Sequence, residues 1–114
     1  MSVTGAKARI TEAVLSWDGV TAHAHRFGGT EYRLGRRELG HIHGDRLVDI
    51  PFPKRVRDGV VVAGRAEPHH MLPDSGWISF YLNKPTDVVQ AIDLLRQSFE
   101  LAVNQRTRLQ SAAS

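Results

Sequence analysis

The sequence predicts an α+β fold with an N-terminal helix, a four-stranded antiparallel meander, a second helix, a fifth strand and a long C-terminal helix. Two observations lead to this prediction. Between residues 20 and 50, short strand-like runs are separated by Gly28-Gly29, Gly35-Arg36 and Gly44-Asp45, which are turn signals. In the last third of the chain, apolar residues recur every three to four positions, as in a helix with one buried side. We expect the helices to lie mainly on one face of the sheet.

The chain has 114 residues, enough for one domain with its own core. We predict a single domain over residues 1–108 and a frayed tail at 109–114, where the sequence is small and polar. The sequence contains no cysteine, which excludes disulfides and thiolate-bound metals. It also contains no apolar run of the roughly 18 residues that a membrane helix needs, so we expect a cytoplasmic protein without a membrane partner.

The glycine turns fix the predicted register of the meander. If each turn is a two-residue hairpin loop, Arg26 faces Glu31 and Arg33 faces Glu38, and both pairs join opposite charges across neighbouring strands. The predicted strands cover residues 20–27, 30–34 and 37–43, and a fourth strand follows Gly44-Asp45.

The same register assigns side chains to the two faces of the sheet. It places His41 and His43 on the face of Tyr32 and Leu39, and Asp49 on the opposite face. We expect helices to cover much of the face that carries Tyr32.

Three helices are predicted around the meander. The first spans Ala6–Ser16 and has Thr4 as its expected cap. The second begins near Pro53 and ends near Ala63, and a strand at Trp77–Leu82 separates it from the third helix, which ends near Arg106. The apolar stripe of the third helix consists of Val88, Ile92, Leu95, Phe99, Ala102 and Val103.

Five stretches of the sequence resemble a family of small bacterial proteins called luciferase family proteins. They are His-Arg-Phe-Gly-Gly-Thr-Glu at 25–31, Glu-Leu-Gly-His-Ile-His-Gly-Asp at 38–45, Asp-Ile-Pro-Phe-Pro at 49–53, Gly-Arg-Ala-Glu-Pro-His-His at 64–70 and Leu-Pro-Asp-Ser-Gly-Trp-Ile-Ser-Phe at 72–80. Flavin-dependent bacterial luciferases are barrels that need about 250 residues, and this chain is too short for one. The resemblance therefore implies a family name rather than a flavin enzyme, and no cofactor is predicted.

More distantly, the order of elements is similar to that of the MmcQ/YjbR or double-wing proteins, which have a CyaY-like fold. In those proteins a helix after the tryptophan-bearing strand contains an Arg/His-x-Ser-aromatic word, which Arg96-Gln97-Ser98-Phe99 matches. This likeness implies DNA binding by analogy only.

The leading functional prediction is a binding module for an anionic partner, either a phosphate-bearing small molecule or nucleic acid. The net charge is +3, and the basic excess lies in the first half of the chain. Arginine side chains suit phosphate and carboxylate, and aromatic side chains supply pocket walls. The predicted ligand-binding residues are Arg36, Arg37, Arg46, Arg55, Arg65, Tyr32 and Trp77.

The alternative prediction is a small histidine-dependent enzyme, with or without a metal. Its candidate catalytic residues are His41, His43, His69 and Asp49. His41 and His43 are two positions apart on one strand, a spacing that can serve one metal.

The predicted register nevertheless argues against a metal, and none is predicted. It places Arg46 opposite His43 and Asp49 on the face away from His41. In an extended segment, His69 and His70 point to opposite sides.

Overall fold

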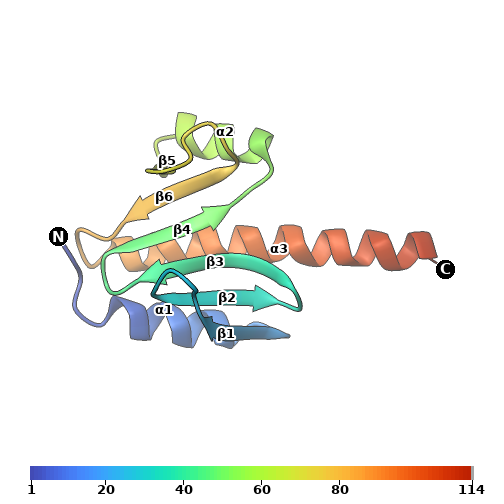
Figure 1. Cartoon of the computed structure of the whole chain (residues 1–114), viewed down its shortest axis with the longest axis horizontal. Coiled ribbons are helices and arrows are strands. Elements are labelled where there is room, and N and C mark those ends of the chain that lie inside the picture. The colour runs from blue at the N-terminus through green and yellow to red at the C-terminus, as the bar shows by residue number, and fades with distance from the viewer. Residues whose placement is uncertain (114) are drawn as a thin grey trace.

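The structure is a computed structural model that describes residues 1–113, which form three helices around one six-stranded sheet (Figure 1). The helices are α1 (Ala6–Leu15), α2 (Lys54–Val62) and α3 (Asp87–Ala113). The strands are β1 (Val20–Ala24), β2 (Thr30–Leu34), β3 (Arg37–His43), β4 (Leu47–Pro51), β5 (Glu67–Pro68) and β6 (Trp77–Tyr81). The sheet order is β1-β2-β3-β4-β6-β5, with all neighbours antiparallel. The predicted α+β class is confirmed.

Helices α1 and α3 lie behind the sheet in Figure 1 and leave the other face of the meander open to the viewer. The core fills the space between the helices and the sheet, and Tyr32, Ile42, Val48 and Leu95 are fully buried in it. The predicted stripe of α3 belongs to this core, with Ile92 and Val103 at its margin. Within residues 1–113, no helix combines the length and the apolar character that crossing a membrane requires.

The meander is confirmed, but two of its three turns are longer than predicted. Gly35-Arg36 is a two-residue loop, and Arg33 pairs with Glu38 as expected. The β1–β2 loop spans residues 25–29 and the β3–β4 loop residues 44–46. The predicted pairing of Arg26 with Glu31 is therefore wrong, because Arg26 lies in the loop and His23 takes its place.

A β-bulge in β3 reverses which face of the sheet the side chains of Gly40–His43 point to, relative to the prediction. Arg33 pairs with Glu38 but Tyr32 pairs with Gly40, so Leu39 is the extra residue. One additional residue shifts the alternation of side chains that follow it. His41 thus lies on the face opposite Tyr32, and the predicted placement of both on one face is wrong.

Helix α3 holds the bulge in place. The Ser98 hydroxyl donates a hydrogen bond of 2.9 Å to the buried carbonyl of Leu39. A Cβ atom at Gly40 would lie 2.8 Å from Leu95 Cδ2 and 3.0 Å from the carbonyl oxygen of Asp49, so only glycine lets the helix approach this closely.

Two predicted helix ends differ from the structure. Thr4 does not cap α1; Gly5 is its N-cap, and the Asp45 carboxylate accepts hydrogen bonds from the backbone N–H groups of Gly5 (3.3 Å) and Lys7 (2.8 Å). A carboxylate favours a helix N-terminus, which explains this cap from the β3–β4 loop. Helix α3 continues past Arg106 through residues 109–113, the stretch predicted as a frayed tail, and position 114 lies outside the described residues.

Candidate functional site

A row of polar side chains crosses the face of the sheet that α1 and α3 do not cover. His41 on β3 pairs with Asp49 on β4, and Asp49 pairs with Ser79 on β6. Directly paired residues on adjacent strands share a face, so the three side chains meet. All three are buried, and Asp49 is only 1% exposed. A buried carboxylate needs partners to offset its loss of water.

Asp49 finds these partners among the histidines. Its Oδ2 atom lies 3.1 Å from His43 Nε2, 3.2 Å from His41 Nε2 and 3.5 Å from His69 Nε2. Its Oδ1 atom accepts a 2.8 Å hydrogen bond from the Ser79 hydroxyl. One carboxylate oxygen is therefore the meeting point of three imidazole rings.

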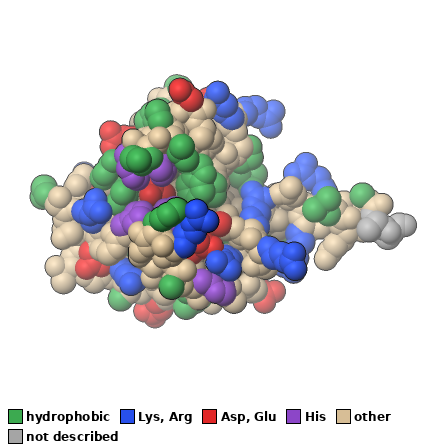
Figure 2. Space-filling model, viewed as in Figure 1, with side chains coloured by type: hydrophobic (Ala, Val, Ile, Leu, Met, Phe, Trp, Pro, Cys, Tyr) green, Lys and Arg blue, Asp and Glu red, His purple; other side chains and the backbone are tan. Residues whose placement is uncertain are grey.

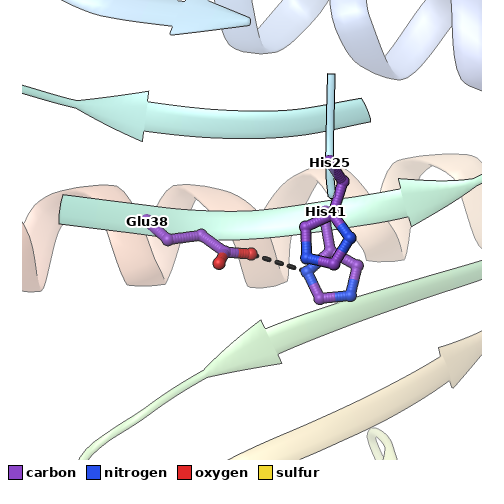
Figure 3. A group of neighbouring side chains, drawn as sticks. All are labelled: His25, Glu38 and His41. Carbon is purple, nitrogen blue, oxygen red and sulfur yellow. Dashed lines mark hydrogen bonds and ion pairs between the residues drawn. The ribbon is translucent and has the colours of Figure 1, made fainter. Parts of the chain in front are cut away.

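Glu38 and His25 hold the His41 ring on its other sides (Figure 3). His41 Nδ1 lies 2.6 Å from a Glu38 carboxylate oxygen, and the bulge brings these residues, three apart in sequence, onto one face. The His25 ring, from the β1–β2 loop, stacks on His41 with 4.0 Å between ring centroids.

The backbone fixes the tautomer of His69. Its Nδ1 atom accepts hydrogen bonds of 3.1 Å from the N–H groups of both Met71 and Leu72. An imidazole nitrogen that accepts hydrogen bonds carries no proton, so the proton of neutral His69 is on Nε2. His69 thus directs an N–H donor at Asp49.

The pKa values in the cluster diverge. Burial disfavours the charged form of His41, but hydrogen bonds and charges of Asp49 and Glu38 outweigh burial and raise its pKa to about 9. Burial opposes ionisation of Asp49, yet hydrogen bonds from His41 and Ser79 lower its pKa to about 2. Burial lowers the pKa of both His43 and His69. Without a metal, the neutral-pH site is an Asp49 carboxylate beside a His41 imidazolium, with two neutral imidazoles.

These shifts predict how the free energy of unfolding of the metal-free protein varies with pH. The stabilisation from Asp49 is complete above its ordinary pKa of 3.8 and is lost as the pH falls toward 2. The stabilisation from His41 is complete below 6.5 and is lost as the pH rises through 9. The pKa values of His43 and His69 are lowered, so their contribution is lost as the pH falls below 6.5. Urea unfolding in EDTA should therefore show a maximum at about pH 6.5. Asp49→Asn should flatten the acid limb and weaken the basic one; an unchanged profile would contradict the assignment.

The cluster forms the floor of a pocket of about 550 Å³. Apolar and aromatic side chains form its walls and mouth: Phe27 from the β1–β2 loop, Met71 and Leu72 from the segment after β5, and Trp77 from β6. Figure 2 shows histidine side chains on this face with hydrophobic side chains beside them. A concave apolar site with a few convergent polar groups is typical of small-molecule binding.

The four predicted catalytic candidates converge in the structure. His41, His43 and His69 all contact Asp49. The predicted catalytic candidates did not include their further partners and neighbours, which are Glu38, His70, Ser79, His25, Phe27, Met71 and Leu72. The isolated Gly40 inside a strand pattern was a signal for the bulge that brings Glu38 to His41.

The predicted ligand-binding residues do not gather at one place. Arg36 and Arg37 lie at the β2–β3 turn and Arg46 in the β3–β4 loop, at opposite ends of β3. Arg55 is in α2, and Arg65 follows α2 and donates a hydrogen bond to Gln97 of α3.

The two predicted aromatic walls differ. Tyr32 is fully buried in the core, where its hydroxyl is 2.6 Å from the Thr11 hydroxyl, so it lines no surface. Trp77 lines the histidine pocket, with its ring centroid 5.4 Å from that of His41.

None of the three geometric objections to a metal holds in the structure. Leu47, not Arg46, is opposite His43. Asp49 shares a face with His41, its direct partner. His69 and His70 both approach the Asp49 carboxylate, at 3.5 Å and 3.8 Å.

Comparison with known proteins places this site within a described family. The family model described as Luciferase domain matches residues 36–98, which is more than half of the chain. The matched range includes Glu38, His41, His43, Asp49 and His69, whereas the β1–β2 loop lies outside it. Comparisons with curated proteins and with solved structures found no match. The chain belongs to the Luciferase domain family.

Proposed function

We propose that this protein is a metal-dependent enzyme. It binds one divalent transition-metal ion through His41 Nε2, His43 Nε2 and Asp49 Oδ2, and acts on a small molecule held in the adjoining pocket. The observation that carries the proposal is the convergence of His41, His43 and Asp49 at the pocket floor, where one potential ligand atom from each lies within 4.8 Å of the other two. Two imidazoles and one carboxylate bind non-haem iron in oxygenases and, in other enzymes, catalytic zinc.

The distances in the cluster suit a metal. Bonds of about 2.0–2.1 Å from a metal to imidazole and carboxylate ligands place neighbouring ligand atoms roughly 2.8–3.4 Å apart in octahedral or tetrahedral geometry. Asp49 Oδ2 lies 3.1 Å from His43 Nε2 and 3.2 Å from His41 Nε2. Both distances match those between neighbouring ligand atoms around one ion.

Outer partners orient two of the ligands. Glu38 accepts a hydrogen bond from His41 Nδ1–H, which leaves Nε2 for the metal once it is deprotonated. Ser79 holds the Oδ1 atom of Asp49, which leaves Oδ2. Carboxylate–histidine–metal arrangements of this kind are typical of metalloenzymes.

His69 supports a different role from that of a ligand. Its Nε2 carries a proton while Nδ1 accepts two backbone hydrogen bonds, so a neutral His69 has no lone pair on Nε2 for a metal. The N–H group can instead donate to a metal-bound oxygen atom and stabilise negative charge there. A metal with three protein ligands keeps coordination positions for water or substrate, as catalytic sites require.

The test is a titration of chelator-treated, tag-free protein with Co(II), whose visible absorption reports ligand geometry. We expect saturation at one Co(II) per chain. Absence of stoichiometric binding, or binding that EDTA treatment and dialysis do not reverse, would contradict a mononuclear site of this kind.

A second candidate function, binding of nucleic acid, is favoured by one observation. Two grooves beside the end of α3 are lined by four arginines, Arg36, Arg37, Arg106 and Arg108, and none of the other lining residues is acidic. Figure 2 shows Lys and Arg side chains gathered where the C-terminal helix leaves the body of the protein. Arginine forks without acidic neighbours suit phosphates.

Salt dependence tests this second candidate. If nucleic acid binds there, Arg36→Gln/Arg37→Gln should weaken binding to all duplex and single-stranded sequences and reduce the salt slope by up to roughly two. Arg65→Gln, which changes an arginine that lines neither groove, is the control. Failure to bind DNA below about 0.1 mM at 50 mM salt would exclude this function.

A further inference from the structure

We infer, on the basis of the proposed metal site, that the substrate is an amphipathic small molecule. It has a flat apolar body that lies between Phe27 and Met71-Leu72, and an oxygen-bearing monoanionic head that reaches the metal. The inference comes from the mouth and walls of the pocket, which the metal proposal does not use.

The mouth of the pocket exposes large apolar side chains to water. Phe27 is 74% exposed, Met71 73% and Leu72 52%. Eight large hydrophobic side chains are exposed among residues 1–113, and these three line one pocket although their segments are more than 40 residues apart. Exposed apolar side chains scattered singly are ordinary, but a group around a cavity marks a binding surface. A ligand with an apolar body would cover these side chains and bury its own apolar surface against them.

Aromatic rings add a preference for a flat body. The Trp77 ring lies 5.4 Å from the ring of His41, a proposed metal ligand, and 5.9 Å from the ring of His69, the proposed N–H donor. Phe27 lies 5.8 Å from His25, which in turn stacks on His41. Aromatic side chains pack best against flat ligands through offset or edge contacts. A pocket of about 550 Å³ admits a body of one or two rings.

The charge and the hydrogen-bond donor at the floor of the pocket favour a particular head group in the ligand. A divalent ion bound by one carboxylate keeps a positive charge at its open coordination positions, since the second carboxylate of the lining, Glu38, lies at His41 Nδ1 and not at Nε2. The His69 Nε2–H donor points into the same place. None of the pocket-lining residues is Lys or Arg, so the pocket lacks the donors that a phosphate group requires. A single anionic oxygen head, such as a carboxylate, enolate or hydroxamate, fits both observations.

Two hydroxamates that share a metal-binding head test the inference. Benzohydroxamate has a phenyl body and acetohydroxamate a methyl group. Each hydroxamate is titrated into Co(II)-loaded protein while the visible Co(II) spectrum is followed. The ratio of the two dissociation constants is then divided by the ratio measured with free Co(II), which removes the difference in their intrinsic affinity for the metal. We expect benzohydroxamate to bind at least tenfold more tightly than acetohydroxamate after this correction.

Variants of the side chains at the mouth of the pocket test whether those side chains cause the preference for benzohydroxamate. Phe27→Ser/Leu72→Ser should remove most of the tenfold preference while Co(II) stoichiometry stays at one per chain. The matched control is Val62→Ser/Val89→Ser, which changes two exposed apolar residues outside the pocket and should leave the preference intact.

The possible failures are distinguishable because Co(II) binding is measured first. Protein that does not bind Co(II) would overturn the metal proposal and, with it, this inference. Protein that binds one Co(II) but shows equal corrected affinity for both hydroxamates, or an undiminished preference in Phe27→Ser/Leu72→Ser, would overturn the inference alone.

Discussion

Replacing His43 with alanine is expected to weaken Co(II) binding by more than about 100-fold, since even the loss of an outer partner of a metal ligand typically costs 10–100-fold. His43 Nε2 lies 3.1 Å from Asp49 Oδ2, so its loss leaves two of the three proposed ligands. The side chain is partly exposed and does not belong to the hydrophobic core, so the variant should remain folded. Competition with a chromophoric chelator measures the affinity, and circular dichroism checks the fold.

The matched control is His23→Ala. His23 is exposed on β1 and its Nε2 lies 2.7 Å from the Thr21 hydroxyl, away from the pocket. This variant should bind Co(II) like the unaltered protein. Equal weakening in both variants would show that the bound Co(II) is held by scattered surface histidines and not by the proposed site.

Phe99→Ala is expected to lower the free energy of unfolding by about 3–5 kcal/mol, through the lost transfer energy of the ring and the cavity left behind. Phe99 is buried on α3, and its ring centroid lies 5.4 Å from that of Trp17. The next turn of the helix toward its start contains Leu95 and Ser98, which contact the bulge, so loosening α3 also releases the strand that carries His41. Urea denaturation measures the loss.

Leu109→Ala provides the comparison on the same helix. Leu109 is 64% exposed, and its truncation should change the free energy of unfolding by no more than about 0.5 kcal/mol. A loss below about 1 kcal/mol for Phe99→Ala would contradict the role of this stripe in holding α3 against the sheet.

The fold could be predicted from the sequence because its elements repeat with clear periods. The spacing of the apolar residues in α3 and the Gly35-Arg36 turn needed no knowledge of distant contacts. The side-chain orientation of Gly40–His43 could not be predicted without knowledge of distant contacts. The bulge is fixed by Leu95 and Ser98, on a helix more than 50 residues later. A second extra residue, in the β3–β4 loop, reverses the alternation again, so the prediction of Asp49 on the face opposite Tyr32 is correct.

The candidate site, like the fold, was predictable where residue type was enough and not where distant contacts decide the geometry. His41, His43, His69 and Asp49 could be selected by residue type, but the predicted register put His41 and His43 on the wrong face of the sheet, away from Asp49. The arginine prediction relied on composition, which does not say where side chains meet; Arg36 and Arg46 lie at opposite ends of β3. The tautomer of His69 depends on two backbone N–H groups in a tight turn, and no sequence pattern shows that.

The central claim is that one metal ion binds between His41, His43 and Asp49. Anomalous diffraction at the Co(II) or Zn(II) absorption edge, from crystals of tag-free protein grown with that metal, tests it most directly. We predict one strong anomalous peak at about 2.0–2.2 Å from His41 Nε2, His43 Nε2 and Asp49 Oδ2, with the His69 ring outside bonding distance. Crystals with the metal at full occupancy elsewhere, and with the three side chains still joined by the direct contacts seen here, would contradict it.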